Sequence, residues 1–93
     1  MLDDVKAALG ITSSVFDAEI TANIAAAKID LTIGDVDIVN ENDAVTAVAI
    51  KTYCKMMHEL NHGSIERYGV LKDAYAAQKA QLGMKTGYTE WTR

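Results

Sequence analysis

The segment from Ala44 to Asn61 constrains the fold of this chain more than any other part of it. At helical spacing its apolar residues cover most of the circumference. The polar residues that remain form one narrow stripe: Lys51, Lys55, His58 or Glu59, and His62. A helix that is apolar nearly all round must be surrounded by other elements. We therefore predict a central helix over residues 44–61, with Asn42 or Asp43 as its N-cap.

Three narrower apolar stripes predict three further helices. A short helix is expected from Leu2 to Leu9, ended by Gly10 as a glycine C-cap. A second is expected from about residue 15 to 32, on a stripe of Phe16, Ile20, Ile24, Ala27 and Leu31. A fourth, capped by Ser64, carries the stripe Tyr68, Leu71, Tyr75 and Leu82. Fourteen alanines and the absence of proline are typical of such a helical chain.

Two segments lack a helical period. Residues 33–43 alternate weakly between acidic and β-branched residues, which predicts an extended arm. Residues 84–93 follow Gly83 and include two large aromatic residues on an otherwise polar tail. The predicted fold class is therefore all-α: a small four-helix domain over residues 1–83, with an extended arm between the second and third helices and a non-helical C-terminal tail over residues 84–93.

Length and charge exclude several function classes. A chain of 93 residues holds one domain with one modest core. Its net charge of −4 argues against non-specific nucleic-acid binding, which needs a basic surface. The acidic N-terminus and the lack of a long apolar run predict neither a signal peptide nor a membrane span, so a soluble cytosolic domain is expected. The single cysteine, Cys54, suits a reducing compartment, and its apolar neighbours predict a buried structural thiol.

The run His58-Glu59-Leu60-Asn61-His62 matches the H-E-x-x-H signature of zinc proteases. Histidines four residues apart share a helix face, and the glutamate can act as general base on a metal-bound water. No spacing selects a third ligand, although Asp73 and Glu90 are conceivable, and the chain is short for a substrate cleft. We predict no catalytic, cofactor-binding or metal-binding residue. A small zinc-dependent hydrolase using His58, Glu59 and His62 stays open as the alternative.

Two other motifs fail in their details. Asp35-Val36-Asp37 opens like a calcium loop, but Asn40 stands at the glycine position and Thr46 at the position of the final glutamate. An acyl-carrier function needs an exposed serine in an Asp-Ser-Leu setting, and the chain contains no Asp-Ser pair.

The order of features along almost the whole chain is informative where single motifs are not. A short opening helix (2–11) is followed by a helix that begins with acids (16–20) and continues as an alanine-rich stretch (25–31). Next come the central helix (44–50) with Tyr53 and a last helix (66–75) with Leu82, before a tail that contains Tyr88. In this order the chain resembles the small head–tail connector (adaptor) proteins of tailed phages. It departs from that family in having no proline near the entrance of a late helix, and in its histidine motif.

The resemblance implies a structural role without catalysis. Connector proteins of this kind form a homo-oligomeric, dodecameric ring on the portal and join the DNA-filled head to the tail. The implied location is the head–tail interface of the virion, after assembly in the host cytoplasm. The implied partners are other copies of the chain, the portal protein, and a downstream connector or tail-completion protein. DNA would pass through the ring without sequence recognition, and no membrane is involved.

The arm and the tail are the predicted partner-binding segments, because their apolar and acidic residues lie outside any helical stripe. The residues singled out are Asp35, Asp37, Ile38, Tyr88 and Trp91. A generic helical protein-interaction module, unrelated to phages, is a further alternative.

Overall fold

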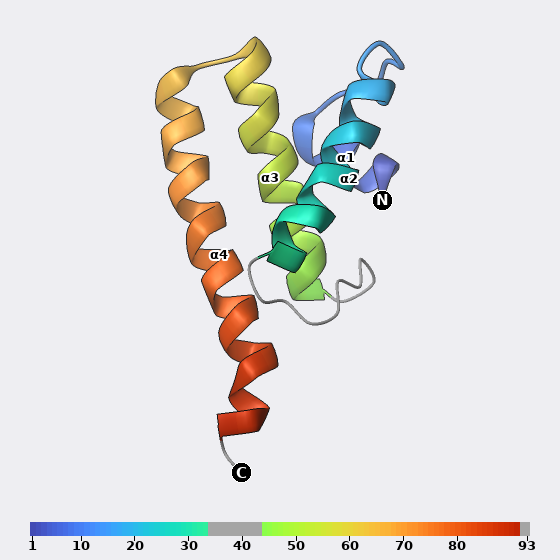
Figure 1. Cartoon of the computed structure of the whole chain (residues 1–93). Coiled ribbons are helices and arrows are strands. Elements are labelled where there is room, and N and C mark those ends of the chain that lie inside the picture. Colours follow the sequence, from blue (N-terminus) through green and yellow to red (C-terminus); the bar gives the residue numbers. More distant parts are fainter. Residues whose placement is uncertain (34–43, 92–93) are drawn as a thin grey trace.

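The computed structural model describes the backbone of residues 1–33 and 44–91 and the side chains of residues 1–31 and 44–82. In those ranges the chain forms four α-helices and no strand (Figure 1). The helices are α1 (Leu2–Leu9), α2 (Asp17–Ile33), α3 (Ala44–His62) and α4 (Ile65–Trp91). The prediction of an all-α domain with four helices is confirmed. The predicted arm lies outside the described residues, except for Ile33, which ends α2.

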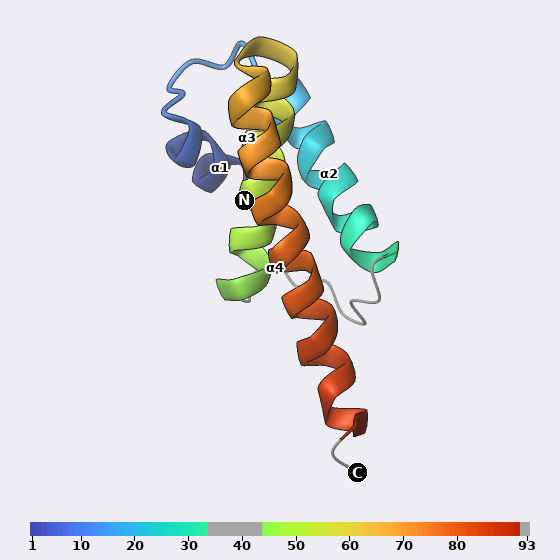
Figure 2. The same ribbon diagram turned by 90° about the vertical axis from the view of Figure 1, so that its left-hand side faces the viewer.

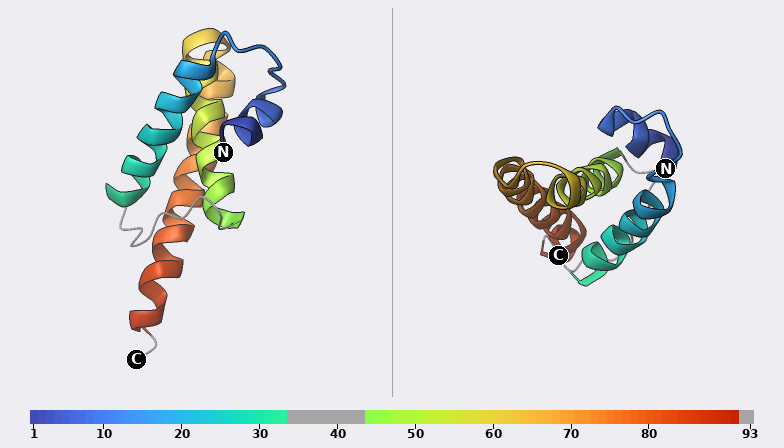
Figure 3. Two further views of the ribbon diagram at one scale, coloured as in Figure 1. Left: turned by 90° about the vertical axis from the view of Figure 1, so that its right-hand side faces the viewer. Right: turned by 90° about the horizontal axis from the view of Figure 1, so that it is seen from above.

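The central position predicted for the third helix is confirmed. α3 packs against each of the other three helices, and most extensively against α4. Figure 2, with α4 in front, shows α1 and α2 to the left and right of α3. The view from above in Figure 3 shows α3 between α4 and the two N-terminal helices, which also contact each other. The buried residues of α3 cover a little more than half of its circumference, while Val45, Val48 and Leu60 are exposed. The buried ones are Thr46, Ala49, Ile50, Thr52, Cys54 and Met56.

The core is made by the apolar stripes that the sequence predicts. α2 contributes four of its five predicted stripe residues as buried side chains, while Phe16 is partly buried before the helix begins. α4 contributes Tyr75 and Leu82, with Tyr68 and Leu71 packed against the same cluster. The buried hydrophobic core of the chain consists of Val5, Ile20, Ile24, Ala27, Leu31, Ala49, Ile50, Cys54, Met56, Tyr75 and Leu82.

The end of α1 has the predicted glycine cap. Gly10 adopts the left-handed conformation, with φ 73° and ψ 25°, which costs a residue without Cβ nothing. The Gly10 N–H donates to the Ala7 carbonyl and the Ile11 N–H to the Lys6 carbonyl, so two carbonyls of the last turn are satisfied. The chain then reverses toward α2, and Lys6 Nζ lies 2.9 Å from Oδ1 of Asp17, at the start of that helix.

The fourth helix is longer than predicted. α4 continues through Gly83 to Trp91, so residues 84–91 are helical and the prediction of a non-helical tail is wrong for them. A single glycine weakens a helix by about 1 kcal/mol relative to alanine, but it keeps its N–H, and no proline follows to end the helix. At 1.5 Å per residue α4 spans about 40 Å and α3 about 28 Å. The last turns of α4 therefore project past the other helices (Figure 1).

Candidate functional site

The first turn of α2 and the last turn of α3 meet at one end of the molecule, at the top of Figure 1. Their meeting joins Glu19 to His62. The Nε2 atom of His62 lies 2.8 Å from Oε2 and 3.1 Å from Oε1 of Glu19. Because an ionised carboxylate only accepts hydrogen bonds, the imidazole N–H is the donor. Asn61 adds a longer hydrogen bond, from Nδ2 to Oε1 of Glu19, at 3.4 Å.

His58, one helical turn before His62, completes a cluster of three metal-ligating side chains. One ligand atom from each of Glu19, His58 and His62 can be chosen so that all lie within 4.8 Å of one another. The cluster is open to solvent, since the side chains of Glu19 and His62 are 31% and 38% exposed. The two histidines share a face of α3, as their spacing predicts, and the carboxylate comes from a helix far away in sequence.

Phe16 forms the apolar wall of this cluster. Its ring meets the His58 ring edge to face, with centroids 5.4 Å apart and planes at 90°. It also meets the His62 ring, with centroids 4.9 Å apart. Contacts of this geometry are favourable between aromatic rings. Phe16 therefore restricts the orientations that both imidazoles can adopt.

Glu59, the acid of the H-E-x-x-H run, is engaged elsewhere. Its Oε2 atom accepts a hydrogen bond of 2.9 Å from the backbone N–H of Ser64, the N-cap residue of α4. Its Oε1 atom lies 3.8 Å from Nη1 of Arg67. A Cβ atom on Gly63 would collide with the Glu59 carboxylate, so a side chain at this position would push Glu59 away from Ser64. Glu59 thus joins α3 to α4.

These contacts change the interpretation of the motif. The carboxylate beside the two histidines is that of Glu19, while the Glu59 carboxylate caps the next helix. Of the two third ligands that the sequence suggested, Asp73 is on the exposed surface of α4 and Glu90 lies outside the described side chains. The cluster therefore offers two imidazoles and one carboxylate, with no general base supplied by its own motif.

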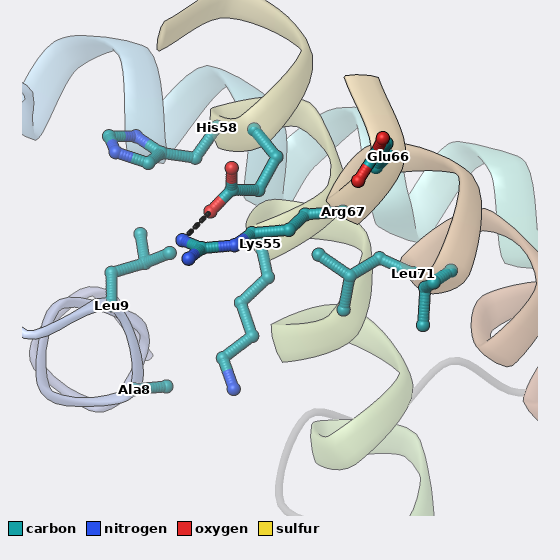
Figure 4. A pocket seen from close by; sticks show the side chains of 9 residues that line it. Ala8, Leu9, Lys55, His58, Glu66, Arg67 and Leu71 are labelled. Carbon is teal, nitrogen blue, oxygen red and sulfur yellow. Dashed lines mark ion pairs between the residues drawn. The ribbon is translucent and has the colours of Figure 1, made fainter. Parts of the chain in front are cut away.

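A pocket of about 600 Å³ lies between α1, α3 and α4, and His58 is among the residues that line it (Figure 4). Its walls mix apolar side chains with charges of both signs, and the ion pair between Arg67 and Glu59 crosses it. The lining residues are Ala8, Leu9, Lys55, His58, Glu59, Glu66, Arg67, Val70 and Leu71. His58 thus belongs both to the pocket lining and to the cluster with Glu19 and His62.

A second polar contact joins α2 to α4. The Tyr75 hydroxyl donates a hydrogen bond of 2.6 Å to Oδ2 of Asp30, which also lies 3.1 Å from Nζ of Lys79. Burial and the bonded carboxylate together raise the pKa of Tyr75 above its usual value. The Tyr53 ring packs edge to face on Tyr75, and burial raises the pKa of Tyr53 as well. These contacts join α2, α3 and α4.

The prediction of a buried thiol at Cys54 is confirmed. Its side chain is 1% exposed, in the core between α3 and its neighbours. Burial raises the pKa of the thiol from 9.0 to about 12. The nucleophilic thiolate is therefore scarce at neutral pH.

The predicted partner-binding residues lie largely beyond what the structure describes. Asp35, Asp37 and Ile38 fall outside the described residues. Tyr88 and Trp91 belong to the last turns of α4, and their side chains are not described. Among the described side chains, large apolar residues are exposed on three helices and before α2: Val15, Ile29, Val45, Val48, Leu60, Ile65 and Val70.

Sequence reasoning missed Glu19 and Phe16 as members of the cluster. The sequence places Phe16 in the apolar stripe of the second helix, and Glu19 is one of the acids that lead that helix. The sequence does not reveal which helix ends lie together, so it could not place the start of α2 beside the end of α3.

No described helix is long and apolar enough to cross a membrane. Comparison with protein families, with curated proteins and with solved structures found no match to this chain.

Proposed function

We propose that this chain is a structural head–tail connector (adaptor) of a tailed phage or prophage, which forms a ring on the portal and joins the head to the tail. One observation carries the proposal furthest: the end of α4 projects beyond the three helices that would cover it in a self-contained bundle (Figure 1). An isolated helix end is marginal in water and gains most of its stability from packing. A neighbouring subunit or the portal would supply that packing.

The distribution of exposed apolar residues supports contacts between unlike faces. Val45 and Val48, 42% and 48% exposed, lie one turn apart on α3, whereas Ile65 and Val70 lie on α4 and are 71% and 70% exposed. A ring is generated when one face of a subunit docks on a different face of the next copy and the rotation closes. Exposed apolar side chains on two different helices suit such a head-to-tail contact.

Net charge supports the passage of DNA. The chain carries −4 at neutral pH. A ring of acidic subunits would not retain DNA by neutralising its phosphates, because such retention requires an excess of lysine and arginine. DNA would therefore pass the ring without being bound.

The zinc-dependent hydrolase is the weaker candidate. Its mechanism needs Glu59 free to accept a proton from a metal-bound water. In the structure the Glu59 carboxylate is bonded to the Ser64 N–H and faces Arg67. A generic interaction module would share the exposed apolar residues but would have no affinity for a portal.

The test is assembly on a portal. The chain would be purified alone and mixed with the portal protein encoded beside it, and the mass of the products measured by light scattering. We expect a ring of this chain bound to the portal, visible by electron microscopy. If the chain and the portal elute separately at concentrations where connectors assemble, the connector proposal is wrong.

A further inference from the structure

We propose that Glu19, His58 and His62 form a binding site for a divalent transition-metal ion, with Zn²⁺ as the expected occupant, and that this ion holds the start of α2 to the end of α3. The inference is independent of the proposed connector function, because it rests on the geometry of three side chains.

The donor set is suited to zinc. Two imidazoles and a carboxylate are ligands that Zn²⁺ accepts, and three protein ligands with one open position form a complete site. Imidazole nitrogen also favours the later first-row metals over Mg²⁺ and Ca²⁺, which prefer oxygen ligands.

The distances are close to those of a bound site. Ligand atoms at about 2.0–2.2 Å from zinc in a tetrahedral arrangement lie about 3.3 Å from one another. The three candidate atoms lie within 4.8 Å of one another, with the Nε2 atom of His62 2.8 Å from the Glu19 carboxylate. Metal would replace the proton between His62 and Glu19, and small shifts of the Glu19 and His58 side chains, without a change of rotamer, would close the remaining gap.

The surroundings favour a cation at this position. His62 occupies the last turn of α3, where the unpaired carbonyls of the helix end attract positive charge. Phe16 packs on both histidines and limits their rotation, so less conformational entropy is lost when a metal binds. Glu19 and His62 are partly exposed, which leaves a path for the ion and an open coordination position toward solvent.

The role that follows is a clamp rather than hydrolysis. α2 and α3 are adjacent in the chain but are separated by residues 34–43, and the three ligands would join them at the end remote from that connection. An ion that binds only the folded arrangement stabilises it by mass action. Glu59, which a hydrolytic mechanism would require, is engaged with Ser64.

The experiment uses the full chain without an affinity tag, freed of metal by chelation and titrated with ZnCl₂ in a calorimeter. We expect saturable binding of one Zn²⁺ per chain and a higher melting temperature with zinc. Glu19→Gln and His62→Gln should each weaken binding by at least about 10- to 100-fold, since loss of even an outer-shell partner costs that much. Glu66→Gln, which changes an exposed glutamate outside the cluster, is the matched control and should bind as the wild type does.

Cobalt provides a second measurement. Co²⁺ in the same site should show the intense visible absorption of a four-coordinate ion, and Glu19→Gln should abolish it while far-UV circular dichroism confirms that the variant is folded. The proposal is overturned if zinc does not bind saturably, or if wild type, Glu19→Gln and Glu66→Gln bind it equally.

Discussion

Cys54 illustrates how position decides the chemistry of a single residue. The sequence places it on the central helix among apolar neighbours, and the structure leaves its side chain 1% exposed. A thiol in such surroundings is kept neutral because burial penalises the thiolate. The same residue on the exposed side of α3 would be open to oxidation and alkylation.

The thiol predicts a loss of stability at alkaline pH. Burial raises the Cys54 pKa from 9.0 to about 12, so the unfolded chain releases the thiol proton first as pH rises. Stability contributed by the protonated thiol is therefore complete below pH 9 and is lost between pH 9 and 12. Urea unfolding at pH 8 and pH 10, under reducing conditions, should show an additional loss of about 1 kcal/mol in wild type compared with Cys54→Ala. Equal pH dependence in the two proteins would contradict this assignment.

Glu59 is a second residue whose environment overrides its motif. Its side chain accepts from the backbone of Ser64, and the Ser64 hydroxyl in turn accepts from the Arg67 N–H at 3.4 Å. The first turn of a helix has unpaired N–H groups, and these two acceptors satisfy two of them. A short sequence motif therefore specifies which residues are present, but not which groups their side chains bond to in the folded chain.

At the scale of the helices, the joint between α3 and α4 depends on this arrangement. The joint consists of Glu59, Gly63 and Ser64: Gly63 provides the space, Ser64 the N-cap and Glu59 the additional acceptor. Because α3 packs most extensively against α4, an error in this turn would misalign the largest helix contact of the molecule.

Replacing Glu59 by alanine should therefore destabilise the fold. We expect Glu59→Ala to lower the free energy of unfolding by about 1 kcal/mol, the usual effect of losing a helix cap. Glu66→Ala removes an exposed acid from the first turn of α4. It should lower the free energy of unfolding by only about 0.3 kcal/mol, because it removes a favourable interaction with the helix dipole. Chemical denaturation measures both. Equal losses in the two variants would show that the Ser64 contact has no special weight.

The helices also show what periodicity can and cannot predict. The stripe from Ile20 to Leu31 and the stripe of Tyr75 and Leu82 are buried as predicted, because a period near 3.6 is a local property of the chain. The end of α4 was predicted at Gly83 and lies at Trp91. A lone glycine lowers helix propensity without removing a hydrogen bond, so the balance of the following residues decides whether the helix continues.

At the scale of the whole molecule, the projecting end of α4 is where the proposed connector function places a partner. Leu82 is buried, and the helix continues beyond it past the reach of α3. The connector proposal predicts that this end of α4 packs against a neighbouring subunit or the portal, because a helix end gains most of its stability from packing.

Removing residues 84–93 should separate folding from assembly. We expect the truncated chain to keep its melting temperature, because the core through Leu82 is intact, and to lose helical signal only in proportion to the residues removed. Co-sedimentation with the portal should fall strongly. In the full-length chain, Tyr88→Ala with Trp91→Ala tests whether the aromatic side chains are responsible, with Lys85→Ala as the control. Undiminished assembly of the truncated chain would refute a role for this segment.

The sequence by itself determined the number of helices, the apolar stripes that α2 and α4 bury, the central place of α3 and the burial of Cys54, since all of these follow from the local spacing of apolar residues. Only the tertiary structure decided that Glu19 stands beside His62, and that Glu59 caps α4. Those pairings depend on which helix ends meet, and this is set by how the stripes pack together in space. Spacing along one helix therefore revealed two possible ligands of a metal, and packing between helices supplied the third.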